Sequence, residues 1–292
     1  MGMQTHVLVA DGAMGTTLFQ MGLAAGESAE LWNVDHPEKI RAVHRQYIEA
    51  GSQLILTNSF GGNRLRLDEL ADRIEELNKA AAQCARLEAD AAPHKVIVAG
   101  SMGPSGTLLE PLGTLTYDEA VQLFAEQAAA LVAGGVDWLW IETMSDLNEV
   151  KAAIAGCRQA APETPLAVTM TFDTNGRTMM GITPEQAAAT LSELGIQVFG
   201  ANCGNGTADF PAIMAKMHAA APTATLIAKA NAGMPTLTET DQVIYDATPE
   251  SMGDYAQQVY ASGARIIGAC CGSTPLHIKS IYNQLREVEN MG

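Results

Sequence analysis

The chain has 292 residues, of which 47% are hydrophobic, enough to fill the core of one large α/β barrel or of two ordinary domains. Its formal net charge of −16 argues against binding to nucleic acid or to an anionic membrane surface, because both require basic patches. Residues 1–9 lack the features of a signal peptide, and no stretch reaches about 18 uninterrupted apolar residues. We therefore expect a cytoplasmic protein without a membrane span, whose clustered cysteines bind metal or react rather than form structural disulfides.

Eight short, largely apolar runs along the chain predict β-strands, and each is followed by a turn and a helical stretch. The runs are 7–10, 53–57, 96–100, 138–141, 166–171, 197–201, 225–229 and 265–269. Near-continuous apolar runs are typical of parallel strands that are buried on both faces.

Helix start and stop signals occupy the stretches between these runs. Residues 37–50 begin with proline and are followed by glycine, and residues 116–133 begin with a capping-box pattern and end before two glycines. Thr-Pro pairs open further helices at residues 183, 248 and 274. Eight strand–helix units predict an α/β protein with the (β/α)8 TIM-barrel fold, in which residues 1–292 form a single domain.

The turns that directly follow the predicted strands carry most of the distinctive residues. These turns are 11–16, 57–63, 100–104, 142–143, 202–204, 231–233 and 270–272. In a (β/α)8 barrel such turns lie at the carboxyl ends of the strands, where the active site is built.

Three thiols lie in two of these turns. Cys203 ends the sixth predicted strand, and Cys270 and Cys271 follow the eighth. Three sulfur ligands would leave the fourth position of a zinc ion open, as in catalytic zinc sites, and a substrate thiol held there would be a nucleophilic thiolate. The residues alone also allow a redox pair or small buried side chains, and core packing is the expectation for Cys84 and Cys157, which lie on predicted helices.

A thiol substrate also needs its other end held. The glycine-rich turn 11–16 offers backbone N–H groups that suit a carboxylate. Asp11 and Glu142, each at a strand end, are placed to receive an ammonium group, so an α-amino acid with a side-chain thiol would satisfy these anchors. The alternatives are a turn cap for Asp11 and a salt bridge at the barrel rim for Glu142.

Taken in order, these motifs resemble the homocysteine S-methyltransferase family, which includes betaine–homocysteine methyltransferases and the homocysteine-binding module of cobalamin-dependent methionine synthases. The resemblance covers nearly the whole chain and rests on the motifs at 11–16, 57–63, 100–104, 141–143, 202–203, 231–233 and 270–275. It implies a zinc-dependent methyltransferase in which a zinc-held homocysteine thiolate takes a methyl group and leaves as methionine.

The resemblance also implies a role for individual residues. The zinc ligands would be Cys203, Cys270 and Cys271. The amino group of homocysteine would be held by Asp11 and Glu142, its carboxylate by the backbone at Gly15 and Thr16, and the pocket would be lined by Asn202 and Asn231.

The motifs do not indicate a single methyl donor. Betaine-using members carry Phe-Tyr where this chain has Phe60-Gly61, a pattern closer to the methionine synthase module. Trp32 offers an aromatic face for an onium group, or packs beside a helix. We favour a small onium donor of the betaine or S-methylmethionine type, with methylcobalamin on a separate corrinoid protein as the alternative.

Two other classes of function share parts of this pattern. A zinc hydrolase would favour histidine and carboxylate ligands, and none of the six histidines falls in a strand-end turn. A non-catalytic thiol or zinc sensor would have the same site without turnover. The sequence leaves open the donor, the choice between homocysteine and another thiol or selenol, the zinc occupancy and the oligomeric state.

Overall fold

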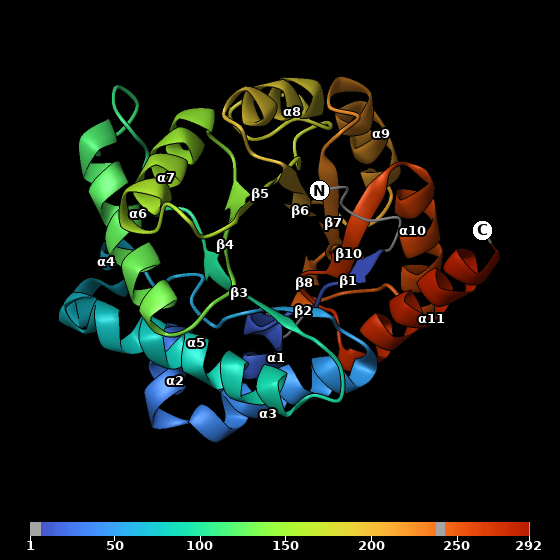
Figure 1. Ribbon diagram of the computed structural model, residues 1–292, viewed down its shortest axis with the longest axis horizontal. Helices are drawn as coiled ribbons and strands as arrows, with labels where there is room; N and C mark the ends of the chain where they lie inside the picture. The colour runs from blue at the N-terminus through green and yellow to red at the C-terminus, as the bar shows by residue number, and fades with distance from the viewer. Residues whose placement is uncertain (1–6, 238–242, 292) are drawn as a thin grey trace. The chain divides into compact units, whose positions relative to one another are not determined.

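The computed structural model describes residues 7–237 and 243–291. It has an eight-stranded sheet whose strands are each followed by a helix, which is the predicted (β/α)8 fold (Figure 1). All eight predicted strands are present, most of them within two residues of the expected ends.

The internal contacts divide the chain into two compact units. Unit 1 comprises Met1–Thr17, Gln46–Leu54 and Met170–Gly292, and unit 2 comprises Leu18–Arg45 and Ile55–Thr169. That residues 1–292 form a single domain stays a prediction.

Unit 1 contains four neighbouring strands, two of which carry the predicted thiols at their ends. In sheet order they are β1 (Leu8–Val9), β10 (Ala264–Ala269), β7 (Thr225–Ala230) and β6 (Val198–Cys203). The three pairs that they form are parallel. The helices of this unit are α8 (Pro184–Glu193), α9 (Phe210–Ala220), α10 (Pro249–Ala261) and α11 (Pro275–Met291).

Unit 2 contains β3 (Ile97–Met102) and β4 (Trp138–Met144), which pair in parallel. Its other elements are the α-helices α2 (Trp32–Asp35), α4 (Arg64–Leu67), α5 (Ile74–Ala91), α6 (Tyr117–Ala133) and α7 (Leu147–Ala160) and the 3-10 helices η1 (Ala29–Leu31) and η2 (Asp68–Arg73). Four elements span the boundary between the units, namely α1 (Gly15–Gln20), α3 (Pro37–Ala50), β2 (Leu54–Leu56) and β5 (Leu166–Met170).

The helix starts follow from side-chain caps, as the sequence predicts. Thr116 and Glu119 form both bonds of a capping box at the start of α6. Thr183 and Thr248 cap α8 and α10 in the same way, each followed by proline in the first turn. Each cap fixes the residue at which a helix begins, and it therefore also fixes the length of the turn between that helix and the preceding strand.

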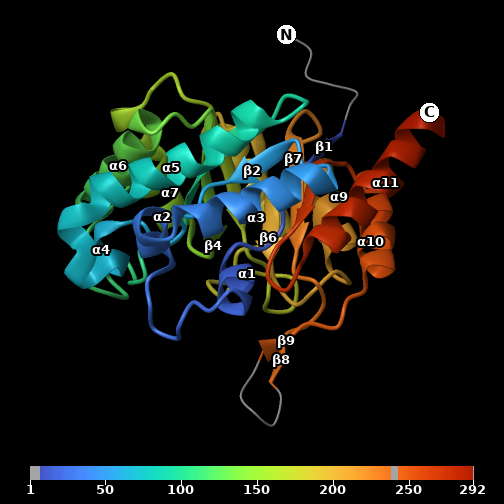
Figure 2. The same ribbon diagram turned by 90° about the horizontal axis from the view of Figure 1, so that it is seen from below.

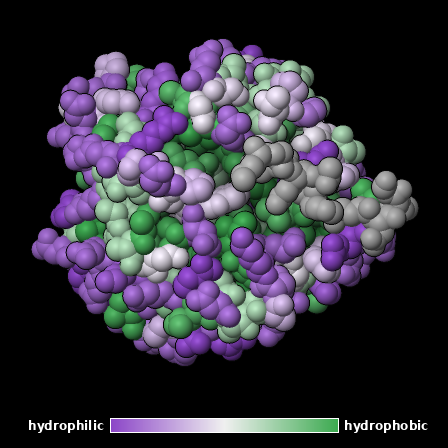
Figure 3. Space-filling model, viewed as in Figure 1, coloured by the Kyte–Doolittle hydropathy of each residue, from purple (hydrophilic) through white to green (hydrophobic). Residues whose placement is uncertain are grey.

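Apolar side chains fill the core of each unit, including Phe199, Ile227 and Ile267 in unit 1 and Trp140 in unit 2. Hydrophilic residues predominate over the outer helices on the face shown in Figure 3. Among the described residues, no helix is both long enough and apolar enough to cross a membrane.

One element of unit 1 has no counterpart in the sequence predictions, which place only the turn 231–233 between β7 and the next helix. Strands β8 (Thr236–Leu237) and β9 (Val243–Ile244) pair antiparallel and project beyond the ends of β6 and β7 (Figure 2). Two-residue strands are too short to show a periodic pattern. The hairpin brings Tyr245 next to the thiols.

Candidate metal and substrate site

The structure brings the three predicted thiols together at the carboxyl ends of β6 and β10 in unit 1. The sulfur atoms of Cys203, Cys270 and Cys271 all lie within 4.8 Å of one another. Cys203 Sγ and Cys270 Sγ are 3.0 Å apart. Because β6 and β10 both flank β7, the turns that follow them meet over the end of that strand.

The backbone around Cys203 is in an uncommon conformation. Its φ is +60°, in the left-handed region that a residue with a Cβ seldom adopts, and Gly204 follows with a φ of +72°. The chain therefore turns sharply as β6 ends. Backbone strain of this kind is typical of functional sites, where the surrounding structure must hold it in place.

Asn231 stabilises this backbone conformation through its hydrogen bonds. Its side-chain Nδ2 donates to the carbonyl of Gly204 at 2.8 Å, and its Oδ1 accepts from the backbone N–H of Cys271 at 3.1 Å. Its own backbone N–H donates to the carbonyl of Cys203 at 3.3 Å. One buried amide thus ties together the two turns that carry the thiols.

Asn202 lies on β6 directly before the first thiol and is buried. Its Nδ2 donates to Cys203 Sγ at 3.5 Å, and its carbonyl accepts from Thr171 Oγ1 at 3.1 Å. The side chain therefore contacts the sulfur itself, in a position to stabilise a thiolate.

The turn 11–16 packs against the second thiol turn. Thr16 Oγ1 accepts from the N–H of Gly272 at 3.2 Å, and the N–H of Ala13 donates to Ser273 Oγ at 2.9 Å. Gly15 is exposed, with open space where a Cβ would point. The two predicted carboxylate anchors thus lie beside Cys270 and Cys271.

Asp11 has a partner that the sequence analysis missed. Lys229 Nζ on β7 lies 2.5 Å from Asp11 Oδ1, and each side chain is only 4% exposed. The signal was a lysine at the end of an otherwise apolar predicted strand, since an ionised lysine is almost never buried unless it is paired. Lys229 also lies close enough to the thiols for its charge to lower the pKa of Cys270.

Tyr245, which follows β9, covers the second thiol turn. It hydrogen-bonds to Cys271, and its pKa is raised by burial and by the neighbouring thiols. Gly272 has a φ of +78°, and a Cβ at this position would overlap the ring of Tyr245. Glycine is therefore required there both by the backbone conformation and by the packing.

The net pKa of both Cys203 and Cys270 is raised. For Cys203 the hydrogen bonds with Cys270 and Cys271, together with burial, raise the pKa well above its usual value. For Cys270 the bond with Cys203 lowers the pKa, but Cys271 and burial outweigh it and the net pKa is raised. A cation among the three sulfurs would reverse this effect, because it stabilises thiolates.

The donor set fits zinc. Two thiolates bound to one tetrahedral zinc ion at about 2.3 Å lie about 3.8 Å apart. The three sulfurs all lie within 4.8 Å of one another, and the 3.0 Å between Cys203 Sγ and Cys270 Sγ is shorter than the spacing on zinc, so these two sulfurs would move apart to bind the ion. Three thiolates leave one coordination position for a further ligand.

The remaining predicted residues lie in unit 2. Glu142 on β4 is buried and accepts a hydrogen bond from Ser101 Oγ. Trp32 is buried, donates from its indole N–H to Glu27, and has the ammonium of Lys39 4.1 Å from its ring centre. The packing interpretation of Trp32 therefore holds. Cys84 and Cys157 are buried in α5 and α7, as expected of core residues.

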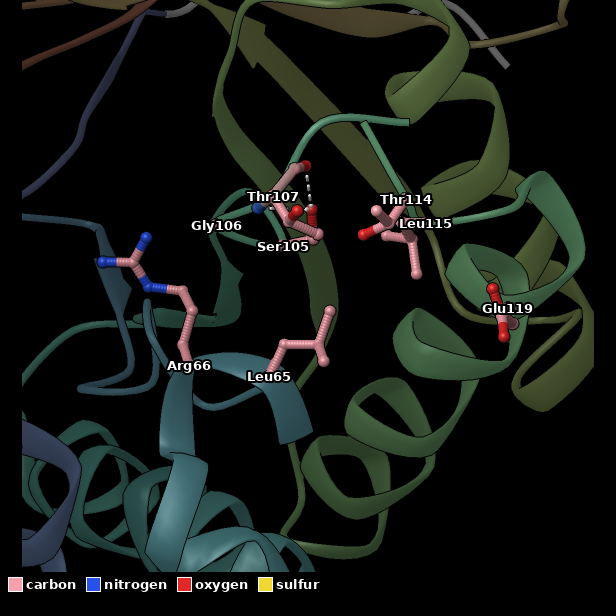
Figure 4. Close-up of a pocket in the computed structure, with 8 residues that line it drawn as sticks. All are labelled: Leu65, Arg66, Ser105, Gly106, Thr107, Thr114, Leu115 and Glu119. Atoms are coloured by element: carbon pink, nitrogen blue, oxygen red, sulfur yellow. Dashed lines mark hydrogen bonds between the residues drawn. The ribbon is translucent and has the colours of Figure 1, made fainter. Parts of the chain in front are cut away.

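Unit 2 also has an open cavity of about 610 Å³. It is lined by residues of α4, of the segment after β3 and of the start of α6, namely Leu65, Arg66, Ser105, Gly106, Thr107, Thr114, Leu115 and Glu119 (Figure 4). Glu119 is held by the cap of α6, and Ser105 Oγ donates to the carbonyl of Thr107 at 2.9 Å. The lining contains none of the predicted site residues.

A comparison with known protein families matches residues 8–285 to the family described as homocysteine S-methyltransferase. The chain belongs to the homocysteine S-methyltransferase family. The expected family and the expected class of enzyme, a methyltransferase, are thereby confirmed.

The sequence is also similar to those of two curated methionine synthases. The chain is 34% identical to the methionine synthase of Mycobacterium leprae and 32% identical to that of Mycobacterium tuberculosis, over 94% of its own length in both cases. It spans about a quarter of the length of these curated relatives, 24% in each case.

Solved structures support the fold. The homocysteine methyltransferase MmuM from Escherichia coli in its metallated form superimposes with a TM-score of 0.81 at 24% identity, covering 96% of this chain and 97% of that one. The oxidised form of the same protein gives a TM-score of 0.78 at 25% identity, covering 95% of this chain and 96% of the other.

Proposed function

We propose that this member of the family is a zinc-dependent homocysteine S-methyltransferase that forms methionine. The observation that carries the proposal is the convergence of Cys203, Cys270 and Cys271 within 4.8 Å in a chain of this family. Zinc bound by these three residues would hold the thiol of the acceptor as a thiolate, the nucleophilic form.

The residues around the thiols would position the thiol turns and bind the other groups of the acceptor. Asn231 keeps the two thiol turns at a fixed separation, and Asn202 donates a hydrogen bond to Cys203 Sγ, which moderates the negative charge on that sulfur. The backbone at Gly15 and Thr16 lies beside the second thiol turn, where it suits the carboxylate of the acceptor. Asp11 would receive the amino group; the same role for Glu142 stays a prediction.

The proposed donor is a small onium compound of the betaine or S-methylmethionine type. Its methyl carbon would be attacked by the acceptor sulfur, and the bond from that carbon to the donor heteroatom would break with its electrons leaving on the donor. The alternative is methylcobalamin on a separate corrinoid protein. Two observations favour the methylcobalamin alternative. One is the 34% identity to a methionine synthase, and the other is the ammonium of Lys39 over the ring of Trp32, because that ammonium would repel an onium group placed there.

The test combines zinc-loaded protein with homocysteine and a series of donors: betaine, dimethylglycine, S-methylmethionine, S-adenosylmethionine, dimethylsulfoniopropionate and methylcobalamin. Methionine is measured by mass spectrometry. Formation from one onium donor supports the proposal, and formation from methylcobalamin alone supports the corrinoid alternative. Homocysteine that binds without forming methionine from any donor would favour a sensor.

Substitutions connect this activity to the thiols. Cys203→Ala and Cys271→Ala should each abolish zinc binding and methyl transfer. Cys157→Ala is the matched control, because Cys157 lies buried on α7 outside the cluster. Full zinc content in either of the first two variants would refute the assignment of the metal ligands.

A further inference from the structure

The ion pair between Asp11 and Lys229 is not explained by the stability of the fold. Its two side chains are each 4% exposed, with Nζ and Oδ1 2.5 Å apart. Removing two charges from water costs several kcal/mol per ion, and well-packed apolar residues of similar volume are often as stable or more so. A buried pair of this kind is therefore weak evidence for stability, and its position at the end of two strands makes it a candidate for ligand binding.

The sheet is arranged so that the pair can form. Strand β10 lies between β1 and β7, and Gly268 is the residue of β10 in register with Lys229. A Cβ on Gly268 would come within 2.8 Å of the carbonyl oxygen of Asp11 and 2.9 Å of the Cβ of Ala10. The absence of a side chain at Gly268 therefore lets the chain at Ala10 and Asp11 pack closely against β10, which brings Asp11 within reach of Lys229.

The pair lies beside the thiol cluster. Lys229 is two residues before Asn231, whose amide contacts both thiol turns, and Asp11 begins the turn whose Thr16 contacts Gly272. A ligand that is anchored at the thiols can therefore reach the pair.

The charges of the pair determine what it can recognise. An isolated ammonium ligand beside Asp11 would also meet the ammonium of Lys229, and an isolated carboxylate beside Lys229 would meet Asp11. A zwitterion in the opposite orientation satisfies both groups, since a lysine ammonium has three donors and a carboxylate accepts at two oxygens.

Given the proposed function, on which this inference rests, we propose that Lys229 determines acceptor specificity. Its ammonium binds the α-carboxylate of the acceptor while Asp11 binds the α-ammonium group, so the buried pair selects α-amino acid thiols over simple thiols. Lys229 thereby adds a charged partner to the backbone N–H groups at Gly15 and Thr16.

The test measures thiol binding without methyl transfer. Protein loaded with cobalt(II) in place of zinc is titrated with homocysteine, with 3-aminopropanethiol, which lacks the carboxylate, and with 4-mercaptobutanoate, which lacks the ammonium group. Thiolate-to-cobalt absorbance reports binding. The unsubstituted protein should bind homocysteine at least roughly 10-fold more tightly than either truncated thiol, as expected for loss of a hydrogen bond to a charged group.

Variants assign the carboxylate contact to Lys229. Lys229→Met should weaken homocysteine and 4-mercaptobutanoate by roughly 10- to 100-fold and should not weaken 3-aminopropanethiol. Lys229→Arg should retain most of the preference for homocysteine. Lys216→Met is the matched control, because Lys216 on α9 is 53% exposed, and it should behave like the unsubstituted protein.

Lys229→Met removes the ammonium beside the buried carboxylate of Asp11 and is at risk of misfolding. The double variant Asp11→Asn/Lys229→Met removes both charges, and its preference for homocysteine should fall to what the backbone N–H groups at Gly15 and Thr16 provide alone. Equal weakening of the three thiols in Lys229→Met, or no preference for homocysteine in the unsubstituted protein, would overturn the inference.

The two proposals fail in different ways. Selective thiol binding without methionine formation would refute the methyltransferase and leave the specificity role intact. Methionine formation combined with equal weakening of all three thiols would do the reverse.

Discussion

Replacing Asn231 with alanine should weaken zinc binding although Asn231 is not one of the three sulfur ligands. The substitution removes the bonds from Nδ2 to Gly204 and from Cys271 to Oδ1, at 2.8 and 3.1 Å. Two such bonds together contribute about 1–3 kcal/mol. If that energy holds the thiol turns at their separation, its loss should lower zinc affinity by roughly 5- to 150-fold.

The assay is competition for zinc between the protein and a chromophoric chelator, with circular dichroism to show that the variant is folded. Asn205→Ala is the matched control, since it is the same substitution in the turn after β6. It removes a bond from Nδ2 to the carbonyl of Asp173 at 2.7 Å, which does not link the two thiol turns. We expect zinc affinity close to that of the unsubstituted protein.

Two results would refute this reasoning. Unchanged zinc affinity in Asn231→Ala would show that the turns keep their separation without the amide. Equal losses in both variants would show that any weakening of the turn after β6 is sufficient.

Three further predictions concern other parts of the molecule. Burial lowers the pKa of His44 from 6.5 to about 4, so between these values the unfolded chain binds a proton that the folded chain does not, and stability falls with the pH by about 3 kcal/mol at most. His44→Leu should therefore make the melting temperature depend less on pH between 6.5 and 4. An unchanged dependence would contradict this prediction. Gly272→Ala should displace Tyr245 and lower zinc affinity, measured by the same competition, and a Tyr245→Ala/Gly272→Ala double variant should recover part of the loss. Thr116→Ala should lower the free energy of unfolding by about 1 kcal/mol, measured by thermal unfolding, because it removes the cap of α6. It should leave zinc affinity unchanged, and a protein of unchanged stability would contradict the prediction.

The strands and helix starts were predictable because their signals are local. A capping box needs only Thr116 and Glu119, three residues apart, and an apolar run such as 166–170 identifies a buried strand by itself. The β8–β9 hairpin was missed because each strand has two residues and its side chains Val243 and Ile244 are exposed. Pattern methods need longer or more regular segments.

The thiol cluster was predictable for a topological reason. In a sheet of parallel strands all carboxyl ends lie at one edge, so residues at strand ends meet even when they are 67 positions apart, as Cys203 and Cys270 are. The role of Asn231 was not predictable in the same way. Its amide bonds depend on backbone groups of Gly204 and Cys271, and no sequence pattern specifies the direction of those groups.

Lys229 shows where the sequence contained a signal that was not used. A strand buried on both faces has no solvent for an ammonium group, so a lysine within it requires a buried anion. The candidates are few, because such an anion must lie near the same strand end, and Asp11 at the end of β1 meets that requirement. A charged residue that breaks an apolar strand pattern therefore predicts its partner as well as its own position. Because well-packed apolar residues in place of both charges are often as stable or more so, the pair is also a candidate for recognising a ligand.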